Sequence, residues 1–416
     1  MDILKIATAG SVDDGKSTLI GRLLYDTKSV TKDKLEAIEA SSQRKGLDFV
    51  DLSLLTDGLI AEREQGITID VAHIYFATST RKYIIADSPG HIEYTRNMIT
   101  GASNAEVFIV LIDARNGVIE QTRRHLFIAS LLKVETVFVC INKMDLVNYD
   151  RDVFEKIKAE VEQLSKTIHF EGKTIFIPIS AKYGVNVVET SETIGWYNGR
   201  SLLSYLEETS VHQKDLSLPL RLPVQLVIRP HSDEHHDFRG YAGKIFSGKI
   251  EQGQKVTVLP SMQNATVKCV WHAEQSIQSA IAGQSVTIEL NEDVDLSRGN
   301  MIVAAAAPFT QSNTITASIC WLNEQTLMMN KTYLLQHGVN TAKAKLTSLD
   351  NKLDLTSMKV VDDVNDIKLN DIAKVSLKTA SPVFADPYHV NPRNGFFILI
   401  DTATNNTVAV GFIEHL

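Results

Sequence analysis

The segment GSVDDGKS at Gly10–Ser17 decides how the rest of the sequence is interpreted. It fits the pattern G-x-x-x-x-G-K-[ST], and it lies between an apolar, β-branched run at Ile3–Ala9 and a helical run at Thr18–Leu24. A strand, a glycine-containing turn and a helix in this order point successive backbone N–H groups at a phosphate. We therefore expect a phosphate-binding loop in which Lys16 neutralises the β- and γ-phosphates and the Ser17 hydroxyl binds Mg²⁺.

A second stretch, GKIFSGKI at Gly243–Ile250, fits the same pattern except that isoleucine replaces the hydroxyl residue. It lies in strand-rich sequence, where glycine commonly marks a bulge or a turn. We interpret its glycines as structural and expect one nucleotide site in the chain.

Further apolar runs follow the first strand, with amphipathic stretches between them. These runs are Tyr83–Ala86, Val107–Ile112, Val137–Ile141 and Thr174–Pro178. Strands that alternate with helices predict βαβ units and a mostly parallel sheet, whose ligands bind at the carboxyl ends of the strands. The first half of the chain is therefore expected to be an α/β domain with a phosphate-loop site.

The motif DSPGH at Asp87–His91 directly follows the strand predicted at Tyr83–Ala86. Phosphate-loop NTPases need a carboxylate on the magnesium side of the nucleotide, so we expect Asp87 to hold Mg²⁺ through water. Gly90 is expected to offer its N–H to the γ-phosphate, and this loop would then respond to the presence of that phosphate.

The segment EREQGITID at Glu62–Asp70 lies between the phosphate loop and Asp87. In a switch GTPase such a segment supplies a threonine to Mg²⁺ only while the γ-phosphate is bound, and Thr68 is the candidate. A charged turn before a strand is the alternative interpretation.

Two later motifs, NKMD at 142–145 and SAK at 180–182, are expected to read the base. Asp145 can accept hydrogen bonds from guanine N1–H and the 2-amino group, whereas adenine presents neither donor there. Asn142 would tie the loop together, the Lys143 stem would cover the ring, and a backbone N–H of the SAK loop would approach guanine O6. GTP with Mg²⁺ is thus the expected ligand. The residues expected to bind it are Gly10, Ser11, Val12, Asp13, Asp14, Gly15, Lys16, Ser17, Thr18, Asp87, Ser88, Pro89, Gly90, His91, Asn142, Lys143, Met144, Asp145, Ser180, Ala181 and Lys182, with Ser17, Thr68 and Asp87 as magnesium ligands.

The composition and charge of the chain limit its number of domains, its partners and its location. A chain of 416 residues is expected to form two or three domains, and 44% hydrophobic with 22% charged residues is typical of a globular protein. The formal net charge of -8 argues against a nucleic-acid partner. The sequence has three dispersed cysteines, no secretory signal pattern and no apolar stretch long enough to span a membrane. We expect a cytoplasmic protein that binds neither nucleic acid nor membrane.

The pattern changes from about Leu218, where helical periodicity gives way to short strands and turn residues. Another set of strand-like runs follows Ala307. This pattern of short strand-like runs and turn residues predicts two antiparallel β-barrel domains after the phosphate-loop domain. The predicted domains are 1–215 for nucleotide binding, 216–308 for the first barrel and 309–416 for the second. Strands are expected at Pro223–Arg229, Tyr241–Ser247, Lys255–Leu259, Ser285–Leu290, Thr314–Trp321, Thr341–Leu349, Ile372–Thr379 and Phe396–Asp401.

The motifs EREQGITID, DSPGH and NKMD together resemble the GTPase domain of translation factors such as elongation factor Tu, over roughly residues 1–210. That resemblance implies an α/β domain followed by two β-barrels, in agreement with the pattern read from the residues. It also implies that His91 orients the attacking water. His91, Lys16 and Thr68 are accordingly the expected catalytic residues.

At several positions the sequence departs from translation factors, and there it is similar to the GTPase subunits of bacterial sulfate adenylyltransferase. Asp14 stands where elongation factors usually carry histidine. The other segments that carry this resemblance are Tyr94–Met98, Gln121–His125, Trp196–Gly199 and Ile228–Asp233, followed by Tyr241–Gly243 and, near the end, Phe396–Asp401.

The resemblance implies that GTP hydrolysis drives the formation of adenylylsulfate and pyrophosphate from ATP and sulfate. The sequence shows no second nucleotide motif for ATP, so the resemblance places adenylyl transfer on a small partner subunit of the ATP-pyrophosphatase type. One alternative is a translation elongation-factor-like GTPase, which the acidic charge and the departures disfavour. Another is a signalling switch without linked catalysis.

Two further segments are not assigned to the nucleotide site. The helical stretch at Thr31–Arg44 is either a partner-facing insertion or an ordinary surface helix. His231, His235 and His236 do not have the spacing of a zinc pair on a helix, so we expect a solvated loop without a metal.

Overall fold

The computed structural model describes residues 2–44, 50–55, 72–88, 95–102, 104–210, 214–230, 238–329, 331–354, 359–362, 364 and 366–416. The chain divides into two compact units, with the boundary between Val211 and His212. Four of the segments singled out in the sequence lie wholly or partly outside the described residues: Glu62–Asp70 with Thr68, the end of the DSPGH motif with Pro89, Gly90 and His91, the start of Tyr94–Met98, and the loop with His231, His235 and His236.

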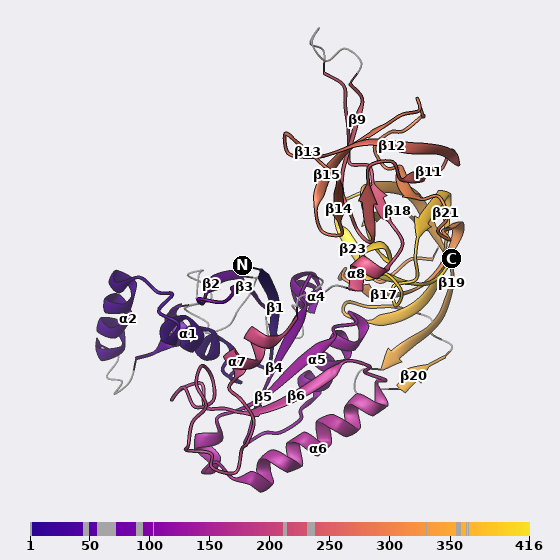
Figure 1. The fold of residues 1–416 in the computed structure, drawn as a ribbon. Helices are drawn as coiled ribbons and strands as arrows, with labels where there is room; N and C mark the ends of the chain where they lie inside the picture. Colours follow the sequence, from indigo (N-terminus) through magenta and orange to yellow (C-terminus); the bar gives the residue numbers. More distant parts are fainter. Residues whose placement is uncertain are drawn as a thin grey trace. The chain divides into compact units, whose positions relative to one another are not determined.

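The first unit is built on one sheet with the strand order β2-β3-β1-β4-β5-β6 (Figure 1). All neighbouring pairs are parallel except β2 and β3, which are antiparallel. The strands are β1 (Ile3–Ala9), β2 (Ala72–Ala77), β3 (Lys82–Asp87), β4 (Val107–Asp113), β5 (Thr136–Asn142) and β6 (Lys173–Pro178). The predicted, mostly parallel α/β sheet is therefore confirmed.

Helices cover this sheet because its central strands are apolar on both faces. Every residue of β4 is buried, and β5 is buried apart from its first residue. The helices are α1 (Lys16–Asp26), α2 (Lys32–Arg44), α4 (Thr95–Ala102), α5 (Glu120–Leu131), α6 (Arg151–Thr167) and α7 (Leu202–Glu208), with 3-10 turns η1 (Leu52–Leu55) and η3 (Met144–Val147).

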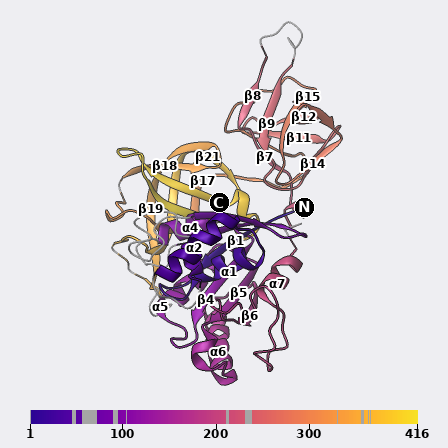
Figure 2. The same cartoon turned by 90° about the vertical axis from the view of Figure 1, so that its left-hand side faces the viewer.

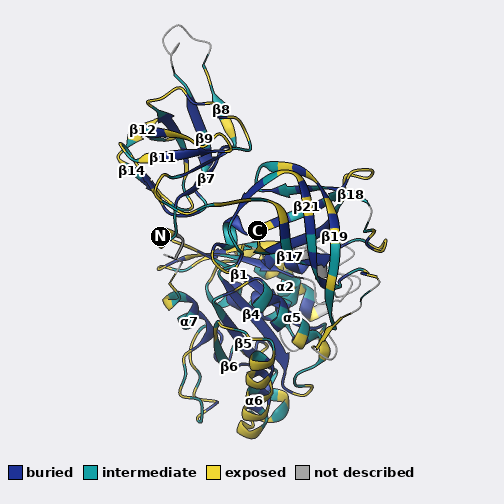
Figure 3. Ribbon diagram, turned by 90° about the vertical axis from the view of Figure 1, so that its right-hand side faces the viewer, coloured by how far each residue is buried: buried dark blue, intermediate teal, exposed yellow. Residues whose placement is uncertain are grey.

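Helix α6 shows how sequence spacing produces this packing. Its four buried side chains, Phe154, Ile157, Val161 and Leu164, recur at the i, i+3, i+7 spacing of a single helix face. Asp150 caps the helix by accepting a hydrogen bond from the Asp152 N–H, at 2.7 Å. The outer face of α6 is exposed (Figure 3).

The second unit consists of antiparallel sheets preceded by the short helix α8 (Lys214–Ser217). One sheet has the order β7-β16-β11-β12-β15-β9-β8, with β13 pairing β12, and β10 pairs β14 separately. The strands of the larger sheet are β7 (Arg221–Pro223), β8 (Leu226–Ile228), β9 (Gly240–Lys244), β11 (Lys255–Leu259), β12 (Gln263–His272), β13 (Gln275–Ile277), β15 (Ser285–Leu290) and β16 (Met301–Ala304). The separate pair consists of β10 (Lys249–Glu251) and β14 (Ser279–Ile281).

The other sheet has the order β18-β22-β23-β17-β21-β19-β20, and a further β18–β19 pairing closes six of these strands into a barrel (Figure 2). Its strands are β17 (Thr310–Trp321), β18 (Thr332–His337), β19 (Asn340–Asp354), β20 (Lys359–Val361), β21 (Ile372–Ala385), β22 (Phe396–Asp401) and β23 (Thr407–His415), with a 3-10 turn η5 (Pro392–Asn394). The predicted fold class is confirmed, whereas the domain limits at 215/216 and 308/309 stay a prediction.

The single strand predicted at Pro223–Arg229 is divided into β7 and β8. The chain changes partner there, because β7 pairs with β16 whereas β8 pairs with β9. Gly243 lies beside this crossing, where an added β-carbon would be 2.1 Å from the Pro223 carbonyl oxygen. Gly248 has φ +77°, which favours glycine. Both glycines of the second phosphate-loop-like stretch thus have structural reasons.

A buried ion pair connects the two sheets of the second unit. The Arg221 guanidinium donates through Nε and Nη2 to the Asp386 carboxylate at 3.0 and 2.9 Å, and its side chain is 4% exposed. Asn391 and Asn394 also donate to Asp386. Such a fork-shaped pair fixes orientation as well as distance.

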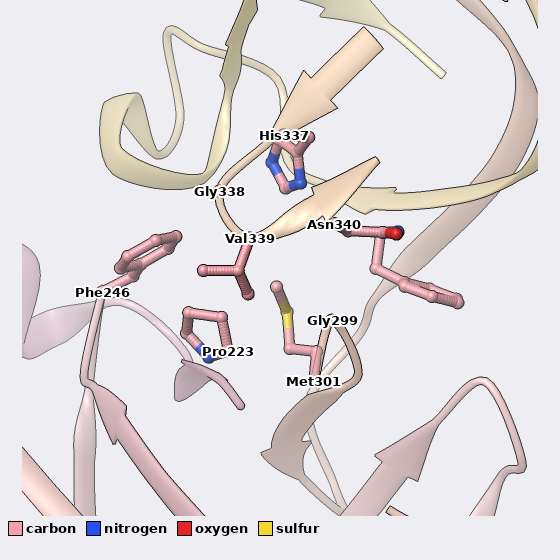
Figure 4. Close-up of a pocket in the computed structure, with 9 residues that line it drawn as sticks. Pro223, Phe246, Gly299, Met301, His337, Gly338, Val339 and Asn340 are labelled. Atoms are coloured by element: carbon pink, nitrogen blue, oxygen red, sulfur yellow. The ribbon is translucent and has the colours of Figure 1, made fainter. Parts of the chain in front are cut away.

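A small pocket lies beside this connection, where the turn between β18 and β19 approaches the other sheet (Figure 4). His337 is buried and its Nε2 lies 3.0 Å from the Asn394 carbonyl oxygen. Val339 and Phe246 face the same space, together with Pro223 and Met301. This apolar contact and the ion pair join the two sheets into one compact unit.

We predict that Asp386→Ala destabilises the second unit by about 3–5 kcal/mol, because it leaves the buried Arg221 charge without its carboxylate. Denaturant unfolding followed by circular dichroism measures the change. Lys249→Ala is the control, since its ion pair with Glu251 is half exposed and should contribute about 0–1 kcal/mol. Equal midpoints for the two variants would contradict the role given to the buried pair.

Candidate functional site

The phosphate loop lies between β1 and α1, as the sequence predicts. Asp13 and Gly15 both have positive φ, 67° and 94°, so the backbone turns sharply before the helix begins at Lys16. Successive N–H groups in such a turn form a concave anion site at a helix N-terminus. Lys16 curls back over this turn, and its Nζ donates to the carbonyl oxygens of Gly10 at 2.6 Å and Ser11 at 3.1 Å.

Burial shapes the charges of this loop. Lys16 is 8% exposed, and burial lowers the pKa of its amine, although the nearby Asp87 and Asp14 carboxylates oppose the shift. The Asp14 carboxylate turns into the loop and accepts the Ser11 N–H at 2.5 Å. Asp14 therefore stabilises the turn of the phosphate loop itself.

Asp87 ends β3 next to the phosphate loop. The parallel register pairs it with Thr8, whose Oγ1 donates to the Asp87 carboxylate at 2.8 Å. Asp87 is 2% exposed. The neighbouring Ser88 hydroxyl is fully buried, and none of the described residues forms a hydrogen bond with it. Two hard oxygen groups thus stand at the carboxyl edge of the sheet.

The side chain of Asn142 connects the phosphate loop with the SAK loop. Its Nδ2 donates to the Asp14 carbonyl oxygen at 2.7 Å, and its Oδ1 accepts the Ala181 N–H at 3.0 Å. An added β-carbon on Gly15 would lie 2.5 Å from the same Nδ2. Three segments that are far apart in the sequence therefore meet on one buried amide.

The side chains of Asp145 and Lys143 are held by different neighbours. The Ser180 hydroxyl donates to the Asp145 carboxylate at 2.6 Å, which fixes the direction of this carboxylate. Lys143 adopts a left-handed conformation with φ 61°, and its Nζ lies 3.0 Å from the Asp113 carboxylate. The NKMD motif is thus joined both to the SAK loop and to the end of β4.

The sequence did not single out Asp113. Burial alone would raise its pKa, but hydrogen bonds from Arg115 and Lys143 outweigh this effect and lower the pKa to about 2. Asp113 is consequently ionised at neutral pH and holds the Lys143 ammonium. Its position directly after the apolar run of β4 was the available signal, because loops at carboxyl strand ends carry the ligand contacts of such sheets.

His125 of α5 belongs to no nucleotide motif, but it lies close enough to the phosphate loop for the charge of Lys16 to act on it. Burial, with the positive charges of Lys16 and Arg124, lowers its pKa to about 3, so the ring is neutral at physiological pH. Its Nδ1 is buried and has no hydrogen-bond partner within the described part of the chain.

The geometry brings together most of the predicted nucleotide-binding segments: Gly10–Thr18, Asp87–Ser88, Asn142–Asp145 and Ser180–Lys182. Thr68, Pro89, Gly90 and His91 lie outside the described residues. Within the described part of the chain, no helix is long and apolar enough to cross a membrane.

Comparison with known families agrees with this arrangement. The family model of the elongation factor Tu GTP-binding domain matches residues 1–211, and a model named GTP-eEF1A C-terminal domain-like matches residues 314–414. The fold and the converging loops define a GTPase of the translation-factor type.

Relatives that match almost the whole chain show to which family within this class of GTPases it belongs. The chain is 46% identical to sulfate adenylyltransferase subunit 1 of Bacteroides fragilis, over 99% of this chain and 86% of the relative. It is 45% identical to the same subunit of Saccharophagus degradans, over 99% and 87%, and to the bifunctional enzyme CysN/CysC of Mycobacterium tuberculosis, over 99% and 67%. The chain belongs to the sulfate adenylyltransferase subunit 1 family, whose GTPase domain gives it GTP binding and hydrolysis.

We predict that Gly15→Ala lowers GTP affinity at least about tenfold. The added β-carbon would have to displace the Asn142 amide, and a left-handed alanine adds about 1–2 kcal/mol of strain. Titration with a fluorescent guanine nucleotide measures the loss. Gly253→Ala is the matched control, since Gly253 also has positive φ but nothing within 4 Å of the added carbon. Unchanged affinity in Gly15→Ala would contradict the assignment of this loop.

Proposed function

We propose that the converging loops form one guanine-nucleotide site that drives sulfate activation on a partner subunit. The observation that carries this proposal is the Asn142 amide, which joins the phosphate loop to the SAK loop through a donor and an acceptor. A single buried side chain thereby fixes the distance between a phosphate subsite and a base subsite. A nucleotide, which carries both groups, is the ligand that this spacing fits.

The phosphate subsite would consist of Gly10–Thr18, with Lys16 as its central charge. Burial disfavours the charged amine of Lys16, and an arriving triphosphate would supply the negative charge that stabilises it. During hydrolysis, water attacks the γ-phosphorus while the bond to the β–γ bridging oxygen breaks, releasing GDP and phosphate. Lys16 would neutralise charge that develops on the phosphate oxygens.

The donor set beside Lys16 fits Mg²⁺. Asp87 offers a carboxylate held by Thr8, Ser17 offers a hydroxyl, and hard oxygen ligands are those that Mg²⁺ prefers. Thr68, which lies outside the described residues, is proposed as a further ligand from its sequence motif alone. The buried Ser88 hydroxyl, which has no hydrogen-bond partner among the described residues, supports the binding of a polar group at this edge of the sheet. Bound there, Mg²⁺ would supply positive charge that neutralises the phosphate oxygens. Gly90 and His91 are proposed to contact the γ-phosphate and to orient the attacking water.

The base subsite would consist of Asn142–Asp145 and Ser180–Lys182. Asp145 would accept two hydrogen bonds from guanine, in an orientation supported by the Ser180 hydroxyl. The stem of Lys143 would cover one ring face while its ammonium is held by Asp113.

The partner is proposed to be a small catalytic subunit of the ATP-pyrophosphatase type. The name of the relatives, sulfate adenylyltransferase subunit 1, supports a second subunit. The mixed anhydride of sulfate and AMP is a high-energy product, so its formation requires a linked exergonic reaction, and GTP hydrolysis would supply it. A cytoplasmic location and the three-domain division at 215/216 and 308/309 belong to the same proposal.

The proposed coupling is tested by purifying the chain alone and together with the small subunit from the same organism. We expect GTP to increase sulfate-dependent adenylylsulfate formation only when both subunits are present, with GDP accumulating in parallel. A non-hydrolysable GTP analogue is the control. Adenylylsulfate formation that is indifferent to GTP would refute the coupling.

The base subsite is tested by a change of specificity. In Asp145→Asn, the amide can donate to the 2-carbonyl of xanthine and accept from N1–H, whereas it sets donor against donor with guanine. An unpaired buried donor costs about 1–3 kcal/mol, so GTP affinity should fall roughly 10- to 100-fold and XTP affinity should rise. Paired titrations with GTP and XTP measure both changes.

Asp152→Asn is the matched control for this exchange, because Asp152 is an exposed carboxylate on α6. It should keep the wild-type preference for GTP. If Asp145→Asn also keeps that preference, Asp145 does not read the base.

A further inference from the structure

Resting on the proposed guanine site, we infer that Arg22 is a positioning residue that ties the base-reading loop to the helix that follows the phosphate loop. Arg22 belongs to no nucleotide motif, and it lies in α1, six residues after Lys16. At about 1.5 Å of rise per residue, the two positions are only about 9 Å apart along one rigid helix.

The guanidinium of Arg22 binds two consecutive carbonyl oxygens of the SAK loop. Nε donates to Ala181 O at 3.2 Å, and Nη2 donates to Lys182 O. The stem also packs on the loop, since an added β-carbon on Gly184 would lie 3.4 Å from Arg22 Cδ. The side chain is only 18% exposed. This is a tertiary contact across about 160 residues of sequence.

The loop that Arg22 holds is itself closed. Ser180 N donates to Val185 O at 3.2 Å, and Val185 N donates to Ser180 O at 3.1 Å. Within this closed loop, the Ala181 N–H is bound by Asn142 and the Ala181 carbonyl by Arg22. The peptide groups that face the base subsite are therefore fixed from both sides, by β5 and by α1.

Neighbours on α1 orient the guanidinium. Asp26, one turn further along, accepts from Arg22 Nη1 at 3.4 Å. The ring of Tyr25 lies under the guanidinium carbon, with 5.6 Å between that carbon and the ring centroid. The Asp26 contact is the longest of the three and lies within α1, so the two carbonyl contacts are the links to the SAK loop and the Asp26 pair only orients the guanidinium.

These contacts predict a defined defect for Arg22→Met, which keeps the stem and removes the donors. The SAK loop should shift away from guanine O6, and GTP and GDP should both bind about tenfold more weakly through faster dissociation. ITP retains O6 and should lose affinity by the same factor. Inorganic tripolyphosphate has no base and should bind as to wild type. The value of kcat at saturating GTP should stay within about twofold, because the reacting phosphate is untouched.

Two variants of the full-length chain accompany this test. Arg22→Lys retains a charged donor and should recover part of the affinity, which also covers the case in which Arg22→Met folds poorly. Asp26→Asn keeps both carbonyl contacts and should change dissociation by less than about twofold.

The outcomes separate this inference from the proposed function. Unchanged GTP dissociation in Arg22→Met, or an equal loss for tripolyphosphate and GTP, overturns the positioning role even though wild type prefers GTP to ATP. A wild-type protein that binds ATP as well as GTP instead removes the guanine site on which the inference rests.

Discussion

The site depends on one buried amide. Asn142 is the last residue of β5, and its side chain uses a donor for the phosphate loop and an acceptor for the SAK loop. No carboxylate could replace it, because a carboxylate has no donor for the Asp14 carbonyl. The spacing of the whole site therefore follows from the length of one side chain and from the register of parallel strands that brings Thr8, Asp87 and Asn142 to the same edge.

Much of this arrangement could be predicted from sequence because it depends on local patterns. The apolar runs located the parallel strands to within a residue or so, and Lys255–Leu259, Ser285–Leu290 and Phe396–Asp401 coincide with β11, β15 and β22. Alternation of strand and helix fixed the sheet type. The motifs directly follow these strands, and parallel strands present their carboxyl ends at one edge of the sheet, so the motifs could be predicted to lie together.

The remainder depends on contacts between distant segments, which no local pattern encodes. Arg22 has no motif of its own, and its partners follow about 160 residues later. In the sequence, Asp113 resembles an ordinary turn residue, because only folding brings the Lys143 ammonium to its carboxylate. The partner change between β7 and β8 likewise depends on which strands flank them, β16 and β9. Tertiary packing decides these features after the elements have formed.

The backbone conformation of Lys143 conflicts with the need for a cation at this position. With φ 61°, this residue occupies a conformation that disfavours side chains by about 1–2 kcal/mol, and glycine would adopt it freely. Glycine, however, has no ammonium to offer the buried Asp113 carboxylate. The turn is therefore less stable than its backbone alone would permit. Selection for heat resistance acting on the backbone alone would favour glycine there, at the cost of leaving the Asp113 carboxylate without this cation.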